Sequence, residues 1–90
     1  MNPMPAIVSS ARTLGRALRD ARRRQKLSQQ ALAERSGVAQ PTISNLERGT
    51  THASLDTILR VTAALGLELL VQPRRGLAPA TPWEAQKPHG

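Results

Sequence analysis

The chain has 90 residues, a formal net charge of +7 from 13 basic and 6 acidic residues, no cysteine, and Trp83 as its single aromatic residue. A disulfide scaffold and a thiolate metal site are therefore excluded, and the core can contain only small aliphatic side chains. Such a small core is marginal alone, so a homodimer is expected. No segment resembles a signal peptide or a membrane span, so we expect a cytoplasmic protein with no membrane partner.

Most of the basic residues are arginine, which binds phosphate groups through two parallel hydrogen bonds. A strongly basic chain of this kind is expected to bind nucleic acid. A basic surface with no partner is the alternative, and charge alone does not decide between the two.

Proline and glycine divide the chain into three parts. Residues 1–8 contain two prolines and are predicted to be a flexible N-terminal arm. Residues 9–72 are periodic in apolar residues and are predicted to form the folded domain. Residues 73–90 contain four prolines together with glycine and alanine, a composition typical of a disordered tail.

The first helix is predicted to begin near Ser9 or Ser10 and to run to about Lys26. Its apolar stripe has helical spacing and consists of Leu14, Ala17, Leu18 and Ala21. Gly15 costs about 1 kcal/mol in a helix interior, but its lack of a side chain would permit a close contact with another helix.

Two short helices joined by a turn are predicted to follow. Ser28 is an N-cap for the first of them, and Gly37 ends it in the left-handed conformation. The second spans about Gln40 to Arg48, and Pro41 suits its first turn, where no backbone donor is required. The residues expected to face the core are Leu32, Ala33, Ile43 and Leu46.

A fourth helix is predicted from the N-cap Ser54 to about Leu65, with Gly66 as its end. Its expected buried face consists of Leu55, Ile58, Leu59, Thr62 and Leu65. Residues 67–72 are apolar with partial alternation, which indicates a strand that ends at Pro73. The simplest partner for a lone strand is the same strand of a second copy, through the dimer-strand residues Leu67, Leu69 and Val71. The alternative is a continuation of the fourth helix packed on its own domain.

The motifs in this region resemble the helix-turn-helix domain of Xre and Cro-type repressors. The resemblance rests on Leu27-Ser28-Gln29, Leu32-Ala33, Gly37-Val38, Ile43-Ser44, Leu46-Glu47-Arg48-Gly49, Leu55-Asp56-Thr57-Ile58-Leu59 and Ala64-Leu65-Gly66. It implies a mainly α, lambda-repressor-like fold of four to five helices, with residues 9–72 as the DNA-binding and dimerisation domain. The short C-terminal strand would then pair across the dimer.

A narrower resemblance, to HipB-type antitoxins, rests on residues 65–71 and the polar tail. Antitoxins of this type repress their own operon and bind a HipA-type serine/threonine kinase toxin. The resemblance therefore implies a repressor that acts as the antitoxin of a type II toxin–antitoxin pair. A free-standing Xre-type regulator without a toxin partner is the alternative, and a chain that mainly assembles a larger complex is a third possibility.

The second helix of the turn motif would enter the major groove of double-stranded DNA, on an inverted-repeat operator. Amide side chains pair with adenine and a threonine methyl packs on thymine, so the predicted base-reading residues are Gln40, Thr42 and Asn45. The predicted contacts to the DNA backbone are Gln29, Ser44 and Arg48. Ordinary polar surface residues are the alternative. Where Asn45 stands, the family pattern often has arginine, which leaves the preferred base open.

Family resemblance also implies a structural pair between Arg22 and Glu47, which would fix the angle of the recognition helix. A contact from Arg22 to phosphate is the alternative. Arg23, Arg24 and Lys26 would either contact the DNA backbone or keep the surface soluble, and the sequence does not favour one role.

Trp83 is the only aromatic residue and lies in the predicted tail. Tail aromatics often anchor a segment in a partner's pocket, so Trp83 is a candidate contact with a HipA-like kinase. The alternative is that it folds back on its own domain or binds nothing.

Catalytic chemistry is not indicated, because no acid, base or nucleophile has a partner at useful spacing. His52 and His89 have no metal-ligand neighbours, and no glycine-rich phosphate loop follows a strand. We therefore expect no enzyme activity, no catalytic residues, no metal and no cofactor.

Overall fold

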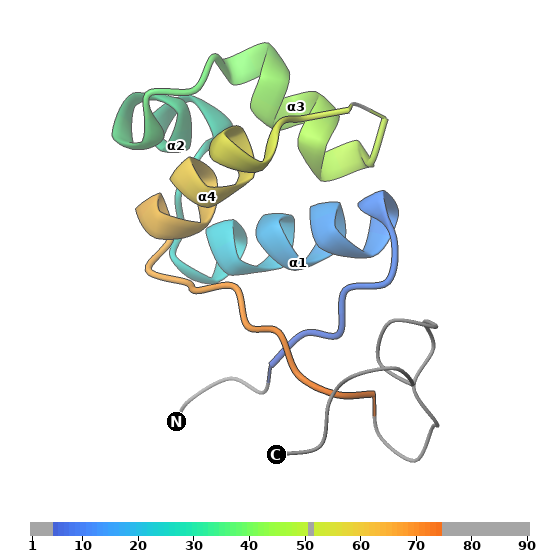
Figure 1. Ribbon diagram of the computed structural model, residues 1–90. Helices are drawn as coiled ribbons and strands as arrows, with labels where there is room; N and C mark the ends of the chain where they lie inside the picture. Colours follow the sequence, from blue (N-terminus) through green and yellow to red (C-terminus); the bar gives the residue numbers. More distant parts are fainter. Residues whose placement is uncertain (1–4, 51, 75–90) are drawn as a thin grey trace.

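Four helices form the domain in the computed structural model, which describes residues 5–50 and 52–74 (Figure 1). They are α1 (Ala11–Arg24), α2 (Gln29–Ser36), α3 (Gln40–Arg48) and α4 (Leu55–Ala64). Each predicted helix is confirmed to within two residues at each end. Among the described residues, no helix has the length and apolarity needed to cross a membrane.

Local hydrogen bonds explain where these helices begin. The side chains of Ser10, Ser28 and Ser54 each accept a hydrogen bond from a backbone N–H in the first turn of α1, α2 and α4. These bonds satisfy donors that have no partner inside the helix, so the predicted N-caps are confirmed. The N-cap of α3 is Ala39, which makes no such bond, and Pro41 lies in the first turn as expected.

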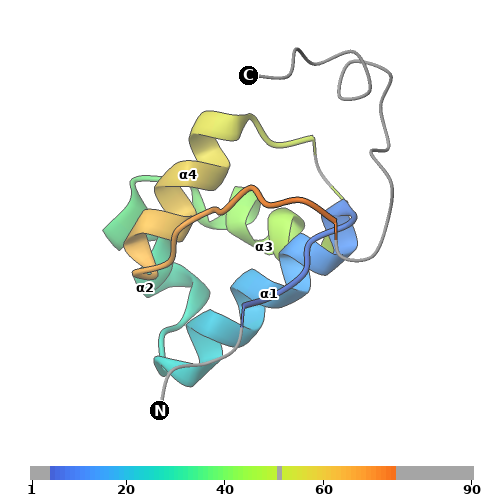
Figure 2. The same ribbon diagram turned by 60° about the horizontal axis from the view of Figure 1, so that its bottom comes forward.

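The core is aliphatic, as the composition requires, and every helix contributes to it. Its most deeply buried side chains are Leu18, Leu32, Ile43 and Val61, one from each helix. Helix α3 packs against α1 and α2, and α2 packs against α4. The helix-turn-helix pair is therefore held from two sides, which leaves the outer side of α3 open (Figure 2).

One predicted face is wrong in part. Leu55 and Leu59 were expected to be buried, but they are 64% and 45% exposed, whereas Val61, which was not expected in the core, is 1% exposed. The buried sector of α4 is rotated toward Val61 and Leu65 because the neighbouring helices cover only that side. Periodicity gives the apolar sector of a helix but not how much of it the rest of the chain covers.

The segment after α4 has no regular secondary structure in residues 67–74 of this single chain. Leu65 is the C-cap and Gly66 has a φ of 70°, so the alternative of a continued helix is wrong. Leu67 packs against the core, whereas Val71 is 97% exposed. A strand is defined by hydrogen bonds to a neighbour, so pairing between two copies stays a prediction. Trp83 and residues 75–90 of the predicted tail lie outside the described residues, as do residues 1–4 of the arm.

Candidate nucleic-acid interface

The outer side of α3 carries the three predicted base-reading residues. Ile43 and Leu46 are buried at 0% and 4% exposure, which anchors the helix on the core. Gln40, Thr42 and Asn45 are only half-buried, so polar groups of these side chains remain accessible at the surface. Such a row of amide and hydroxyl groups on a short helix can form hydrogen bonds with base edges in a major groove.

A buried ion pair ties α3 to α1. Arg22 Nε donates to Glu47 Oε2 at 2.7 Å and Arg22 Nη2 donates to Glu47 Oε1 at 3.0 Å, a two-pronged contact between guanidinium and carboxylate. Arg22 Nη1 donates to the Leu27 carbonyl oxygen at 2.7 Å. The side chains of Arg22 and Glu47 are 11% and 4% exposed. Each nitrogen of the guanidinium thus has a partner, and the orientation of α3 relative to α1 is fixed at this point.

The ion pair also changes the acid–base chemistry of Arg22. Its hydrogen bonds to Glu47 raise the pKa of the Arg22 guanidinium, because they stabilise the charged form, and the nearby negative charge acts in the same direction. Burial opposes this shift but is the weaker of the two effects. Arg22 therefore stays protonated at every pH at which the protein is folded.

Two glutamines extend this pair to the start of the recognition helix. Gln29 Nε2 donates to Glu47 Oε1 at 3.1 Å, and Gln40 Nε2 donates to Gln29 Oε1 at 2.7 Å. We call the four residues Arg22, Glu47, Gln29 and Gln40 the polar network. It joins α1, α2 and α3, so the predicted structural pair, one predicted backbone contact and one predicted base reader lie in one hydrogen-bonded chain.

The network uses only part of the hydrogen-bonding capacity of the two glutamines. The Nε2 group of Gln29 has two hydrogens and one of them is directed to Glu47, which leaves a second donor. Among the described residues, no hydrogen bond reaches Gln40 Oε1, so this oxygen can accept from the amino group of adenine or cytosine.

Asn45 and Arg48, which the sequence assigns to different roles, contact each other. Arg48 Nη2 donates to Asn45 Oδ1 at 2.6 Å. In this conformation Asn45 presents its Nδ2 donor, whereas recognition of adenine requires both the oxygen and the nitrogen of the amide. Arg48 must therefore release Asn45 before Asn45 can pair with adenine in that way.

Gly15 allows α1 and α3 to approach closely enough for the ion pair to form. A Cβ atom at this position would lie 2.6 Å from the Glu47 carbonyl oxygen. The predicted close helix contact at Gly15 is confirmed, and its partner is the backbone at the C-terminal end of α3. Gly49, in the left-handed conformation directly after α3, packs against the backbone of Arg12 in the same way.

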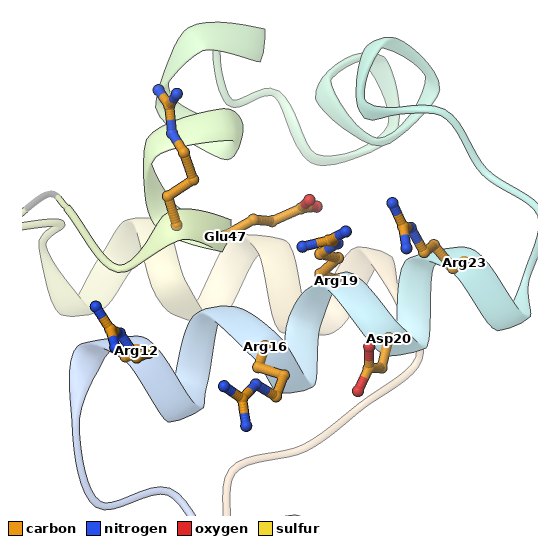
Figure 3. A pocket seen from close by; sticks show the side chains of 7 residues that line it. Arg12, Arg16, Arg19, Asp20, Arg23 and Glu47 are labelled. Carbon is orange, nitrogen blue, oxygen red and sulfur yellow. The ribbon is translucent and has the colours of Figure 1, made fainter.

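A groove of about 430 Å³ runs beside the same α1–α3 contact (Figure 3). Its lining residues are Arg12, Arg16, Arg19, Asp20, Arg23, Glu47 and Arg48. The sequence analysis singled out Arg23 and Arg48 but missed the three other arginines. Their spacing of four, three and four residues, from Arg12 to Arg23, is the signal that would have found them. Among the described residues, no group of His, Cys, Asp and Glu could hold a metal ion.

Comparison with known families and proteins places this geometry in context. The family profile described as Helix-turn-helix matches residues 18–71. The HTH-type transcriptional regulator y4dL of Sinorhizobium fredii is 46% identical over 63 residues, which cover 70% of this chain and 32% of that protein. The chain thus spans about a third of the length of this relative.

Solved structures of DNA-binding regulators have the same fold. The restriction-modification controller protein C.AhdI of Aeromonas hydrophila matches with a TM-score of 0.62 and 36% identity, over 64% of this chain and 88% of that one. HipB in a complex with the O2 20mer matches with a TM-score of 0.74 and 25% identity, over 80% of this chain and 100% of HipB. A HipA–HipB–O2–O3 complex matches with a TM-score of 0.71 and 26% identity, over 77% and 97% of the two chains.

Proposed function

The chain belongs to the Xre-type helix-turn-helix family of transcriptional regulators, and we propose that it is a repressor that binds a specific operator as a homodimer. The observation that carries this proposal is the polar network, which fixes α3 on α1 and α2 before any DNA is bound. A pre-arranged recognition helix loses little conformational freedom on binding, which favours affinity for a matching site.

Base recognition is assigned to Gln40, Thr42 and Asn45 in the major groove. Gln40 has an oxygen that can accept from a base amino group, and the methyl group of Thr42 can pack on thymine. Asn45 has a donor directed outward while Arg48 holds its oxygen. A base that offers an acceptor in the major groove therefore suits Asn45 better than one that needs both of its amide atoms.

Backbone contacts are assigned to Gln29, Ser44 and Arg48. Gln29 is the first residue of α2, where unpaired N–H groups and the positive helix end favour a phosphate, and its second Nε2 hydrogen can join them. Arg48 is exposed at the end of α3 and can reach a phosphate once it leaves Asn45.

Dimerisation is supported by the apolar surface that a single chain leaves open. The exposed large apolar side chains include Leu55 and Leu59 of α4 and, after it, Leu69, Leu70 and Val71. A second copy that pairs its residues 67–71 with these would cover the surface and form the predicted strand. The two recognition helices would then read an inverted repeat, about 34 Å apart or a multiple of that distance.

An antitoxin role is the finer proposal. HipB is matched over its full length, and one matched HipB structure also contains HipA. These observations support a repressor that also binds a HipA-like serine/threonine kinase toxin, with the tail 73–90 and Trp83 as the proposed contact. The match to C.AhdI, a controller of restriction-modification, supports the alternative of a regulator without a toxin.

Selection of duplexes from a random library tests the DNA-binding proposal. We expect enrichment of an inverted repeat, and Asn45→Ala should then weaken binding to that repeat by about 1–3 kcal/mol and to random DNA much less. Glu34→Ala, at an exposed position on α2, is the matched control and should change neither affinity. Equal losses for Asn45→Ala on both duplexes would remove the base-reading assignment.

Co-purification of the full chain from its native cells tests the antitoxin proposal. Recovery of a HipA-like kinase at equal stoichiometry supports it, and Trp83→Ala should then lower that recovery. Recovery of the chain with DNA alone would favour the free-standing regulator. If Trp83→Ala leaves the kinase affinity unchanged, Trp83 is not part of the contact.

A further inference from the structure

We propose that a row of arginines on α1 is a second phosphodiester-binding surface, which holds the DNA backbone beside the segment that α3 reads. The row consists of Arg12, Arg16, Arg19 and Arg23. This inference rests on the proposed function, because it assumes that the chain binds duplex DNA, but it concerns residues outside the helix-turn-helix pair.

The row follows from helix geometry. At 3.6 residues per turn, positions 12, 16, 19 and 23 fall within about 60° of one another around α1. They extend over about 16 Å of the helix axis, at a rise of 1.5 Å per residue. Double-stranded DNA carries about one phosphate per 3.4 Å of axis on each strand, so the row can lie beside several successive phosphates.

The position of the row relative to α3 comes from the helix contact at Gly15. Gly15 and Arg22, which face α3, are directly beside the row on the surface of α1. In Figure 3 the side chains of Arg12, Arg19 and Arg23 extend from α1 toward the α3 side, while Arg16 points the other way. Arg48, at the end of α3, lines the same groove. The row is therefore continuous with the proposed backbone contact at Arg48.

The charge of this surface is strongly positive and uncompensated. The groove is lined by five arginines and by two carboxylates, Asp20 and Glu47. Glu47 is already bound by Arg22 and Gln29. Within residues 5–50 and 52–74 the ion pairs are Arg22–Glu47 and Arg60–Asp56, so no arginine of the row is neutralised by a described carboxylate. All four are exposed, as a group that binds a polyanion must be.

A DNA backbone fits this surface better than an acidic protein segment does. The groove is shallow and open, its described lining includes no apolar side chain that would anchor a peptide, and guanidinium groups bind phosphate oxygens in pairs. Because such contacts are independent of sequence, the row should raise affinity for all duplexes alike.

The test compares two triple variants that each lower the net charge by three. The first carries Arg12→Gln, Arg19→Gln and Arg23→Gln. The control carries Arg24→Gln, Arg35→Gln and Arg60→Gln, at exposed positions outside the groove. Glutamine and arginine have similar helix propensities, so both triples should keep the helical circular dichroism of the unmodified chain.

Binding to a random 20-base-pair duplex and to the selected operator is measured from 50 to 300 mM salt. Each lost phosphate contact lowers the slope of log K against log salt by about 0.9. We expect the first triple to lower the slope by about 2 to 3 and the affinity at least about tenfold on both duplexes. The control should lower the slope by less than about 1. A third triple, with lysine at positions 12, 19 and 23, should retain most of the slope.

The outcomes separate this inference from the proposed function. If the unmodified chain binds the operator but the first triple keeps its slope, or loses no more than the control, the row is not a phosphate site while the repressor proposal stands. If the unmodified chain binds neither duplex in a salt-dependent way, both proposals fail. If the first triple does not fold, the single changes Arg19→Gln and Arg23→Gln decide, each with an expected slope change of about 0.9.

Discussion

The two sides of this domain differ in how far a single chain completes them. On the α1–α3 side, the polar network gives each of its buried charged groups a hydrogen-bond partner, and no buried side-chain nitrogen or oxygen among the described residues lacks one. On the α4 side, Leu55 and Leu59 are exposed, as are Leu70 and Val71 after the helix. The side proposed to read DNA is thus complete within one chain, whereas the apolar side is proposed to need a second copy.

This difference teaches where each kind of interaction is set. Buried charges must be paired within the fold, because an unpaired buried charge costs several kcal/mol. Apolar side chains tolerate exposure at a smaller cost each, so a chain can leave them for a partner to cover. The predictions below change one side at a time, and the other side should not respond.

The largest effect is expected for Glu47→Ala, which leaves Arg22 buried without its carboxylate. The free energy of unfolding should fall by about 3–5 kcal/mol, measured by urea denaturation at fixed protein concentration. The double variant Arg22→Met with Glu47→Leu removes both charges and should recover much of that loss while DNA affinity stays low. If Glu47→Ala costs under about 1 kcal/mol, the pair does not hold α3 on α1.

Gly15→Ala should destabilise the domain by about 2 kcal/mol, since the added Cβ would meet the α3 backbone. On helix propensity alone the same change would stabilise by about 1 kcal/mol, so the sign of the effect is the result. Ala63→Gly, at an exposed position on α4, is the control and should cost about 1 kcal/mol from propensity. A stabilised Gly15→Ala variant would contradict the close contact between the helices.

Val71→Asp should weaken dimerisation about tenfold, or about 1.4 kcal/mol, without altering the monomer fold. Val71 is 97% exposed in one chain, so its effect must come from a second copy. Sedimentation equilibrium measures the association, with Gln30→Asp on α2 as the control of equal charge. A dimer as strong as that of the unmodified chain would exclude Val71 from the interface.

Arg60→Gln should have the smallest effect, about 0.3 kcal/mol on the free energy of unfolding. It removes the Arg60–Asp56 ion pair, whose N–O distance of 2.9 Å is close to that of the buried pair, but whose side chains are 58% and 74% exposed. High salt should abolish even this contribution. A loss near that of Glu47→Ala would mean that distance, and not burial, decides the strength of the two pairs.

The local features of the fold were predictable because they depend on neighbours in the chain. Serine caps, the left-handed glycines 37 and 49 and the spacing of apolar residues each act within a turn or two of helix. The base-reading and backbone candidates followed from the same short motif, and most of them lie on α3 or at the start of α2. The pairing of Arg22 with Glu47 was available only through family resemblance, since the two residues are 25 positions apart.

The sequence by itself determined the helices, their ends, the aliphatic core and the basic character of the chain, because composition, capping and periodicity are local properties. The tertiary structure decided which face of α4 is covered, that Gln29 and Gln40 join the Arg22–Glu47 pair, and that Arg48 holds Asn45. It also placed the arginines of α1 beside the recognition helix. These features depend on the angle and distance between helices, which packing around Gly15 and the shared core sets.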